Sequence, residues 1–235
     1  MKLEVFPSRI PDDLDAAIAE LEERVSQLPE PDATEAYNRE LFPLACLSVQ
    51  RQAELRARRK LAFIPVGTQP YSPILAVLAN PAERTVLLHT PGSRAFLHDV
   101  LESVPVEQPS LREFDEEPNP LLILDIVESE LAWTGRPTRD QVAVDVTSGR
   151  KSTVATLGAV AAAMGFIQSY LLSSPIPGKP NLHRAPRLVT LPDPGSFWGL
   201  RQREAARQLL QAGAFAAAEA TGRSARRLQS SKEPS

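Results

Sequence analysis

The stretch 142–153 reads Val-Ala-Val-Asp-Val-Thr-Ser-Gly-Arg-Lys-Ser-Thr and runs straight into 154–165, Val-Ala-Thr-Leu-Gly-Ala-Val-Ala-Ala-Ala-Met-Gly. Its apolar, β-branched start predicts a buried parallel strand, and its small-residue second half predicts a helix. The turn between them points the first N–H groups of that helix, several hydroxyls and two cationic side chains at one spot. Because unpaired helix N–H groups carry partial positive charge, this turn predicts an anion site. The alternative is that the turn only caps the helix and that its two cations are solvated.

The bulk composition limits the possible function classes. The chain has 235 residues, 43% of them hydrophobic, which is enough for one domain with its own core plus extensions. Its net charge of −3 creates no overall basic field, so a polyanion has to be bound by a local site. Cys46 is the single cysteine, which excludes an internal disulfide and a cysteine-based zinc cluster. The sequence shows no secretory leader and no apolar segment long enough for a bilayer, so we expect a cytoplasmic protein without membrane contact.

The first sixty residues predict helices. Apolar residues recur at helical spacing over 12–28, and a proline-containing break separates this segment from a second helix expected over about 34–59. A basic cluster follows at the end of the second helix. We interpret this cluster as a solvated face rather than a ligand site. Its members are Arg51, Arg56, Arg58, Arg59 and Lys60.

Strands and helices alternate from residue 61 onward. Beside the strand that opens at Val142, strands are expected over 61–66, 84–89, 110–114 and 166–172. This alternation predicts an α/β fold, a doubly wound, mostly parallel, Rossmann-like sheet. Such sheets bind ligands outside the carboxyl ends of their strands, where the strand order reverses. The two loops that follow strong strands are therefore expected to converge at that edge. They are residues 67–72 and 147–151.

The C-terminal part predicts small, separate elements. We expect an exposed loop over 173–180, an edge strand over 187–191, and helices over about 197–212 and 214–220. The polar composition from Gly222 onward predicts disorder. The predicted organisation is an N-terminal helical extension at 1–60, a Rossmann-like domain at 61–191, C-terminal helices at 192–221 and a disordered tail at 222–235.

Several common motifs are absent from the sequence. No glycine-rich dinucleotide fingerprint follows the first strand, where Gly67 stands alone, and no Gly-x-x-x-x-Gly-Lys-Ser/Thr loop occurs. Arg84 and His89 have the Arg-x4-His spacing of a class of metal-independent ribonucleases, but both fall on one predicted strand, and we interpret the match as accidental. Trp133 and Trp198 are interpreted as packing anchors. Because the histidines and carboxylates show no metal-ligand spacing, the sequence predicts neither a metal nor a cofactor.

The motif Asp145-Val-Thr-Ser-Gly-Arg-Lys-Ser-Thr153 resembles the Asp-x-Thr-Gly-Gly-x-Lys-x-Met motif of CARF domains, the CRISPR-associated Rossmann-fold sensors. The segment 63–90 resembles the first strand–helix–strand unit of the same family, and 195–218 resembles the helices that follow the CARF domain in its ribonuclease members. The resemblance covers about residues 61–220. Two residues depart from the motif: Ser148 replaces its first glycine, and Thr153 replaces its methionine, which we interpret as a change in packing.

The resemblance implies a homodimer that binds a cyclic oligoadenylate, a tetra- or hexa-adenylate ring made as a second messenger in type III CRISPR immunity. A two-fold dimer presents each loop twice across one cleft, which suits the symmetry of such rings. Lys151 and Arg150 would neutralise phosphates, the hydroxyls of Thr147 and Ser148 would bind phosphate or a 2′-hydroxyl, and the first loop would meet ribose or base edges. Asp145 would orient the turn. The candidate ligand-binding residues are Gly67, Thr68, Gln69, Thr147, Ser148, Gly149, Arg150, Lys151 and Ser152.

Three functions stay open at this point. The first is a sensor that has no effector domain of its own and acts through a separate partner protein. The second is a metal-independent ring nuclease that cleaves the bound ring, with Lys151 and Thr68 as candidate catalytic residues, because that reaction needs an in-line 2′-hydroxyl and a cation at the developing charge. The third is a Rossmann-like domain that is unrelated to CRISPR and binds another nucleotide.

Overall fold

A six-stranded sheet forms the centre of the molecule. The computed structural model describes residues 3, 5–115, 119–192 and 200–230, and its sheet has the order β3-β2-β1-β4-β5-β8. All neighbours pair in parallel except β5 and β8, which are antiparallel. The prediction of a doubly wound, mostly parallel, Rossmann-like α/β fold is therefore confirmed. The strands are β1 (Arg59–Pro65), β2 (Ala82–His89), β3 (Pro109–Glu113), β4 (Val142–Asp145), β5 (Ile167–Leu172) and β8 (Arg187–Leu191).

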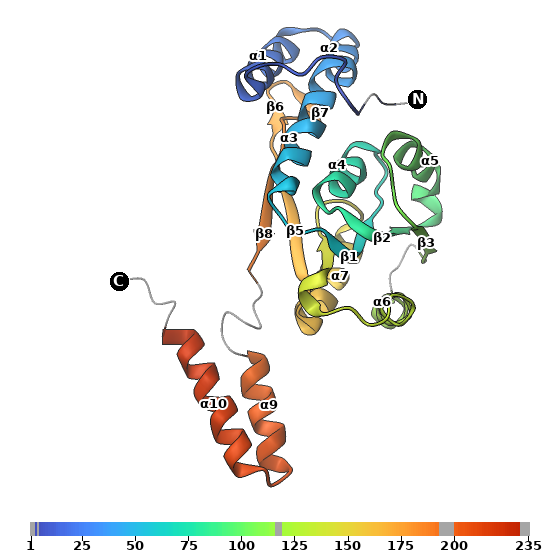
Figure 1. Cartoon of the computed structure of the whole chain (residues 1–235). Helices are drawn as coiled ribbons and strands as arrows, with labels where there is room; N and C mark the ends of the chain where they lie inside the picture. The colour runs from blue at the N-terminus through green and yellow to red at the C-terminus, as the bar shows by residue number, and fades with distance from the viewer. Residues whose placement is uncertain (1–2, 4, 116–118, 193–199, 231–235) are drawn as a thin grey trace.

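Helices cover both faces of this sheet. Figure 1 shows α4 and α5 on one side and α6 and α7 on the other. Successive side chains along each strand point to opposite faces of the sheet, so each strand contributes to both layers. Ile64 of β1 belongs to the cluster under α4 and α5, and its neighbour Phe63 belongs to the cluster under α6 and α7. These helices are α4 (Tyr71–Ala79), α5 (Arg94–Ser103), α6 (Pro120–Trp133) and α7 (Lys151–Met164).

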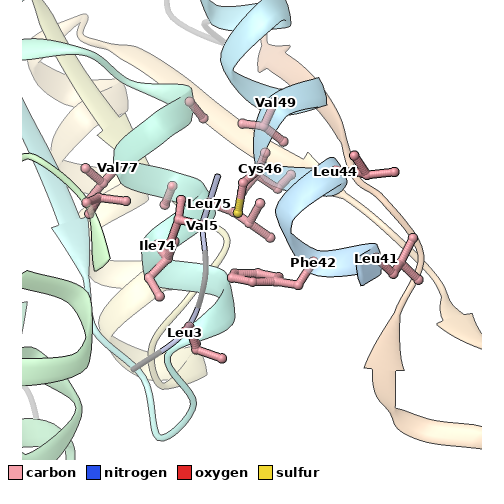
Figure 2. Close-up of a cluster of buried hydrophobic side chains, with 14 of the residues drawn as sticks. Leu3, Val5, Leu41, Phe42, Leu44, Cys46, Val49, Ile74, Leu75 and Val77 are labelled. Atoms are coloured by element: carbon pink, nitrogen blue, oxygen red, sulfur yellow. The ribbon is translucent and has the colours of Figure 1, made fainter. Parts of the chain in front are cut away.

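The N-terminal helices pack onto the same core as α4. Apolar residues of α3, among them Phe42, Cys46 and Val49, face Ile74 and Leu75 of α4 in one buried cluster (Figure 2). The same helices lie beside the small hairpin of β6 (Pro175–Ile176) and β7 (Lys179–His183) (Figure 1). The extension is made of α1 (Leu14–Gln27), α2 (Asp32–Ala36), the π-helical turn η1 (Tyr37–Leu41) and α3 (Phe42–Glu54).

Two predicted boundaries were wrong. The second N-terminal helix ends at Glu54 rather than near residue 59, because Arg59 already enters β1 and its N–H donates to the Pro81 carbonyl at 3.0 Å. At the other end, the tail predicted to be disordered from Gly222 continues the helix α10 (Phe215–Ser230). Alanine-rich sequence favours this helix, and Arg223 pairs with Glu219 one turn earlier at 3.2 Å.

The other C-terminal helix is α9 (Leu200–Gln211), which packs against α10. Its predicted start at Phe197, like the predicted packing role of Trp198, lies outside the described residues. None of the helices in the described part of the chain is long and apolar enough to cross a membrane.

The strand order reverses between β1 and β4. From β1 the chain proceeds outward to β2 and β3, and it then returns to add β4 and β5 on the other side. The two central strands pair directly, with Phe63 opposite Val144, so their carboxyl ends lie next to each other. This is the position where doubly wound sheets open a crevice for a ligand. The predicted convergence of the two loops is thereby confirmed.

Candidate functional site

The loops that leave β1 and β4 touch each other. A Cβ atom on Gly67 would stand 3.2 Å from the backbone nitrogen of Gly149, and one on Gly149 would stand 2.8 Å from Cβ of Pro65. Gly149 also has φ +101°, a left-handed conformation that favours glycine. The buried hydroxyl of Ser148 donates to the carbonyl of Pro65 and ties the second loop to the end of β1. The floor of the crevice is therefore formed by backbone in close contact.

A buried carboxylate holds the second loop in shape. Asp145 is fully buried at the end of β4 and accepts hydrogen bonds from Thr147 N (2.8 Å), Thr147 Oγ1 (3.1 Å) and Ser169 Oγ (3.2 Å). Burial raises its pKa to about 6, and the hydrogen bonds from Thr147 act in the opposite direction. The Thr147 hydroxyl in turn accepts from Leu171 N at 2.9 Å. Asp145 therefore orients the turn from below and does not face a ligand.

The helix that follows this loop begins without a capping side chain. Arg150 occupies the N-cap position of α7, and its side chain makes no capping hydrogen bond to the first turn of the helix. Ser, Thr, Asp or Asn usually supplies that acceptor, and its absence leaves the helix end positive. The side chains of Arg150, Lys151 and Ser152 are exposed around this end. The first turn of α7 thus offers backbone donors, one hydroxyl and two cations to an anion.

A buried hydroxyl without a partner lies in the same first turn. Thr153 is 1% exposed, and its Oγ1 makes no hydrogen bond with any residue that the structure describes. It lines a cavity of about 70 Å³ at the carboxyl ends of β1 and β2, together with Gly67, Thr68, Gly149 and Arg150. A buried hydroxyl that is left unpaired costs about 1–3 kcal/mol. A ligand oxygen in this cavity is the partner that would satisfy it.

Thr153 was not among the ligand residues predicted from the sequence. Its departure from the motif's methionine was interpreted as a packing change, because a sequence does not show whether a hydroxyl finds a partner. The signal that could have found it is the replacement of an apolar motif residue by a hydroxyl within the first turn of a helix that starts at an anion site.

The predicted ligand residues differ in their hydrogen bonding, their exposure and the pocket that they line. The hydroxyls of Thr147 and Ser148 are already donors within the protein, so neither keeps a proton to donate to a phosphate. Thr68 and Gln69 are exposed on the first loop, and Lys151 and Ser152 are exposed on α7. The residues that line the small cavity are Gly67, Thr68, Gly149 and Arg150, and those that line a second pocket beside β5 are Gln69 and Thr147.

Arg84 lies away from this crevice, near the start of β2. It donates from Nε to Glu130 at 2.6 Å, and its guanidinium carbon lies 3.7 Å from the ring centre of Trp133. His89 is buried at the carboxyl end of β2, between Leu88 and Thr90, which line the small cavity. The basic cluster near the start of β1 lies at the opposite ends of the strands. There Lys60 pairs with Glu83 at 2.6 Å. Within the described ranges, no three His, Cys, Asp or Glu side chains come together to hold a metal ion.

Comparison with known proteins finds likeness among solved structures alone, and it is distant. No protein-family model and no curated protein matches the chain. Among solved structures, Can2 from Sulfobacillus thermosulfidooxidans, in complex with cyclic tetra-adenylate, is similar with a TM-score of 0.42 and 15% identity. The match covers 53% of this chain and 34% of that protein, so the chain spans about a third of the length of that neighbour.

Proposed function

We propose that this protein is a sensor of cyclic oligoadenylate, which it binds in the crevice between the loops after β1 and β4. The motif from Asp145 to Thr153, which resembles that of CARF domains, forms one wall of the crevice. The sensor would act as a homodimer in the cytoplasm and pass its signal to a separate effector protein. It belongs, on this proposal, to type III CRISPR defence.

The uncapped start of α7 carries the proposal. Arg150 and Thr153, with its unpaired hydroxyl, line one cavity at the point of strand reversal, and the exposed cation Lys151 stands between them in the first turn of α7. All of these groups can donate or carry positive charge, which suits a phosphodiester and not a cationic or apolar ligand. Because Gly67 and Gly149 carry no Cβ, their backbones meet at the floor of the crevice and leave backbone atoms open to a ligand.

The shape of the ligand follows from symmetry. A monomer offers one α7 end, and a dimer with a two-fold axis offers two that face one another. A ring of four or six nucleotides contains a two-fold axis, so both subunits can bind the same groups on opposite sides of it. A linear nucleotide has no such axis and would engage the two subunits unequally.

Cyclic tetra- and hexa-adenylate provide the direct test. We expect one of them to raise the melting temperature, with about 2.7 kcal/mol of added stability at a ligand concentration 100 times the Kd, and to be recovered intact after incubation and chromatography. Lys151→Ala is expected to weaken binding by about 10–100-fold, since a hydrogen bond to a charged group is worth about 1.5–3 kcal/mol. Lys60→Ala, at the opposite edge of the sheet, is the matched control and should bind like wild type.

The outcomes separate the three candidate functions. Recovery of linear product would replace the sensor by a ring nuclease and would make Lys151 and Thr68 the first residues to substitute. A melting temperature that neither ring changes would contradict both functions and favour a Rossmann-like domain for another nucleotide. Equal binding by the Lys151→Ala and Lys60→Ala proteins would place the ligand elsewhere.

Thr153→Val is expected to change stability and binding in opposite directions. Valine keeps the shape of threonine and removes the unpaired hydroxyl, so the free protein should gain about 1–3 kcal/mol of unfolding free energy. The same change should weaken ring binding about tenfold or more, because a donor to the ligand is lost. Thr156→Val, one turn along α7, is the control. Urea denaturation and calorimetric titration measure the two effects, and a stability loss on Thr153→Val would show that the hydroxyl has a partner in the free protein.

A further inference from the structure

A second pocket, of about 170 Å³, opens on the β5 side of the same crevice. The 70 Å³ cavity described above is lined from β1, β2 and the residue after β3, whereas this pocket is lined from β5, the β6–β7 hairpin and the N-terminal extension. Gln69 of the first loop and Thr147 of the second line it as well. The two hollows therefore flank one pair of loops. Gln69 and Thr147 belong to the two loops that also carry Gly67 and Gly149 of the small cavity, so the second pocket adjoins the proposed phosphate site.

Three side chains in this pocket have no partner among the residues that the structure describes. They are the amides of Gln69 and Asn181 and the imidazole of His183, and the last two are exposed on β7. An amide presents one donor and one acceptor side by side, which is the complement of the adenine edge at N6 and N7. Tyr170 and Tyr71 line the same pocket, and aromatic side chains are the groups on which unpaired bases stack.

The wall of the pocket is fixed by the N-terminal extension. Tyr71 donates from its hydroxyl to Asn38 Oδ1 at 2.8 Å and packs edge-on against Tyr37 with ring centres 5.5 Å apart. Both Tyr37 and Asn38 belong to the π-helical turn η1, a rare element that is frequent at functional sites. Tyr37 also lines the pocket itself. The N-terminal extension thus fixes the position of the Tyr71 ring in the wall of the pocket.

The opposite wall is held by α1. Glu22 accepts from Ala185 N at 2.9 Å and lies 3.5 Å from Arg184 Nη1, directly after the β6–β7 hairpin. Arg184 lines the pocket, and Glu22 is largely buried behind it. The hairpin that carries Asn181 and His183 is therefore anchored before any ligand arrives, which lowers the entropic cost of binding.

From this arrangement we infer that the pocket is a nucleobase subsite that selects adenine, with Asn181 and Gln69 on the base edge and the tyrosines against its face. The inference rests on the proposed function, since it assumes a phosphodiester ring at the start of α7. It assigns the N-terminal helices a part in ligand recognition, because η1 and α1 position the two walls.

The test compares cyclic tetra-adenylate with cyclic tetra-uridylate, rings that share a backbone and differ in their bases. Calorimetric titration of the full chain should show at least about tenfold tighter binding of the adenylate ring, the discrimination that one bidentate amide–adenine pair provides. Asn181→Leu should reduce this ratio towards one and leave the affinity for the uridylate ring unchanged. Lys151→Ala should weaken both rings by the same factor and keep the ratio.

Each outcome decides between the two proposals. Equal affinity of the wild-type protein for both rings, or a ratio that Asn181→Leu leaves intact, would overturn the base subsite and leave the ring sensor standing. Failure of the wild-type protein to bind either ring would overturn the sensor and this inference with it. Asn181 is exposed, so its substitution leaves the melting temperature of the free protein unchanged, and an altered ratio reports on recognition rather than folding.

Discussion

Gly149→Ala is expected to abolish measurable binding of cyclic oligoadenylate, a loss of more than about 100-fold. The added Cβ would stand 2.8 Å from Pro65 Cβ and 3.6 Å from Val154 Cγ2, so the second loop has to move away from the end of β1. The backbone at φ +101° adds a cost of about 1–3 kcal/mol for any residue other than glycine. The first N–H groups of α7, the cavity floor and the loop contact would all shift together, and calorimetric titration measures the result.

Gly135→Ala separates the clash from the backbone strain. Gly135 has φ +75°, and a Cβ there would meet nothing within 4 Å, so this variant carries the same kind of strain without the contact. It should lose a similar share of stability and bind the ring like wild type. If the folded Gly149→Ala protein binds with wild-type affinity while its melting temperature falls, the ligand does not lie over this junction, and the proposed site is wrong.

The position of the candidate site was predictable from the sequence because it depends on local patterns. Apolar runs predicted the strands. Because parallel sheets bind ligands where the strand order reverses, the loops after β1 and β4 were predicted to lie together. The pairing of Phe63 with Val144 realises that expectation. The end of α10 was mispredicted because polar composition was given more weight than the helix propensity of its alanines.

The chemistry within the site depends on contacts that pattern alone does not reveal. Thr147 and Ser148 were expected to face the ligand, but Asp145 and the Pro65 carbonyl use their hydroxyl protons. Thr153 was expected to pack, but it keeps an unpaired hydroxyl. A sequence does not distinguish a hydroxyl that is used within the protein from one that can bind a ligand. The three-dimensional positions of its neighbours decide this. The proposed part of the N-terminal extension in the second pocket was not predictable for the same reason. The hydrogen bond from Ala185 N to Glu22, beside the β6–β7 hairpin, joins residues 163 positions apart in the sequence.

Glu130→Ala is expected to lower the free energy of unfolding by about 3–5 kcal/mol, the cost of leaving a buried charge without its partner. Glu130 is fully buried on α6 and accepts from Arg84 Nε at 2.6 Å, Arg112 Nε at 2.7 Å and Ser110 Oγ at 2.7 Å. Burial alone would raise its pKa, but the hydrogen bonds from Arg84, Ser110 and Arg112 lower it. The carboxylate therefore joins α6 to β2 and to the edge strand β3.

Glu128→Ala provides the matched control on the same helix. Glu128 pairs with Arg136 at 3.4 Å on the surface, and exposed pairs of this kind contribute about 0–1 kcal/mol. Urea denaturation of both variants should therefore give a difference of at least about 2 kcal/mol between their unfolding free energies. Equal unfolding free energies would mean that Arg84 and Arg112 are solvated once Glu130 is removed, and that the α6 side of the sheet depends on its apolar contacts alone. Because β2 leads directly into the small cavity, a loosened β2 in Glu130→Ala should also weaken ring binding, whereas Glu128→Ala should leave it unchanged.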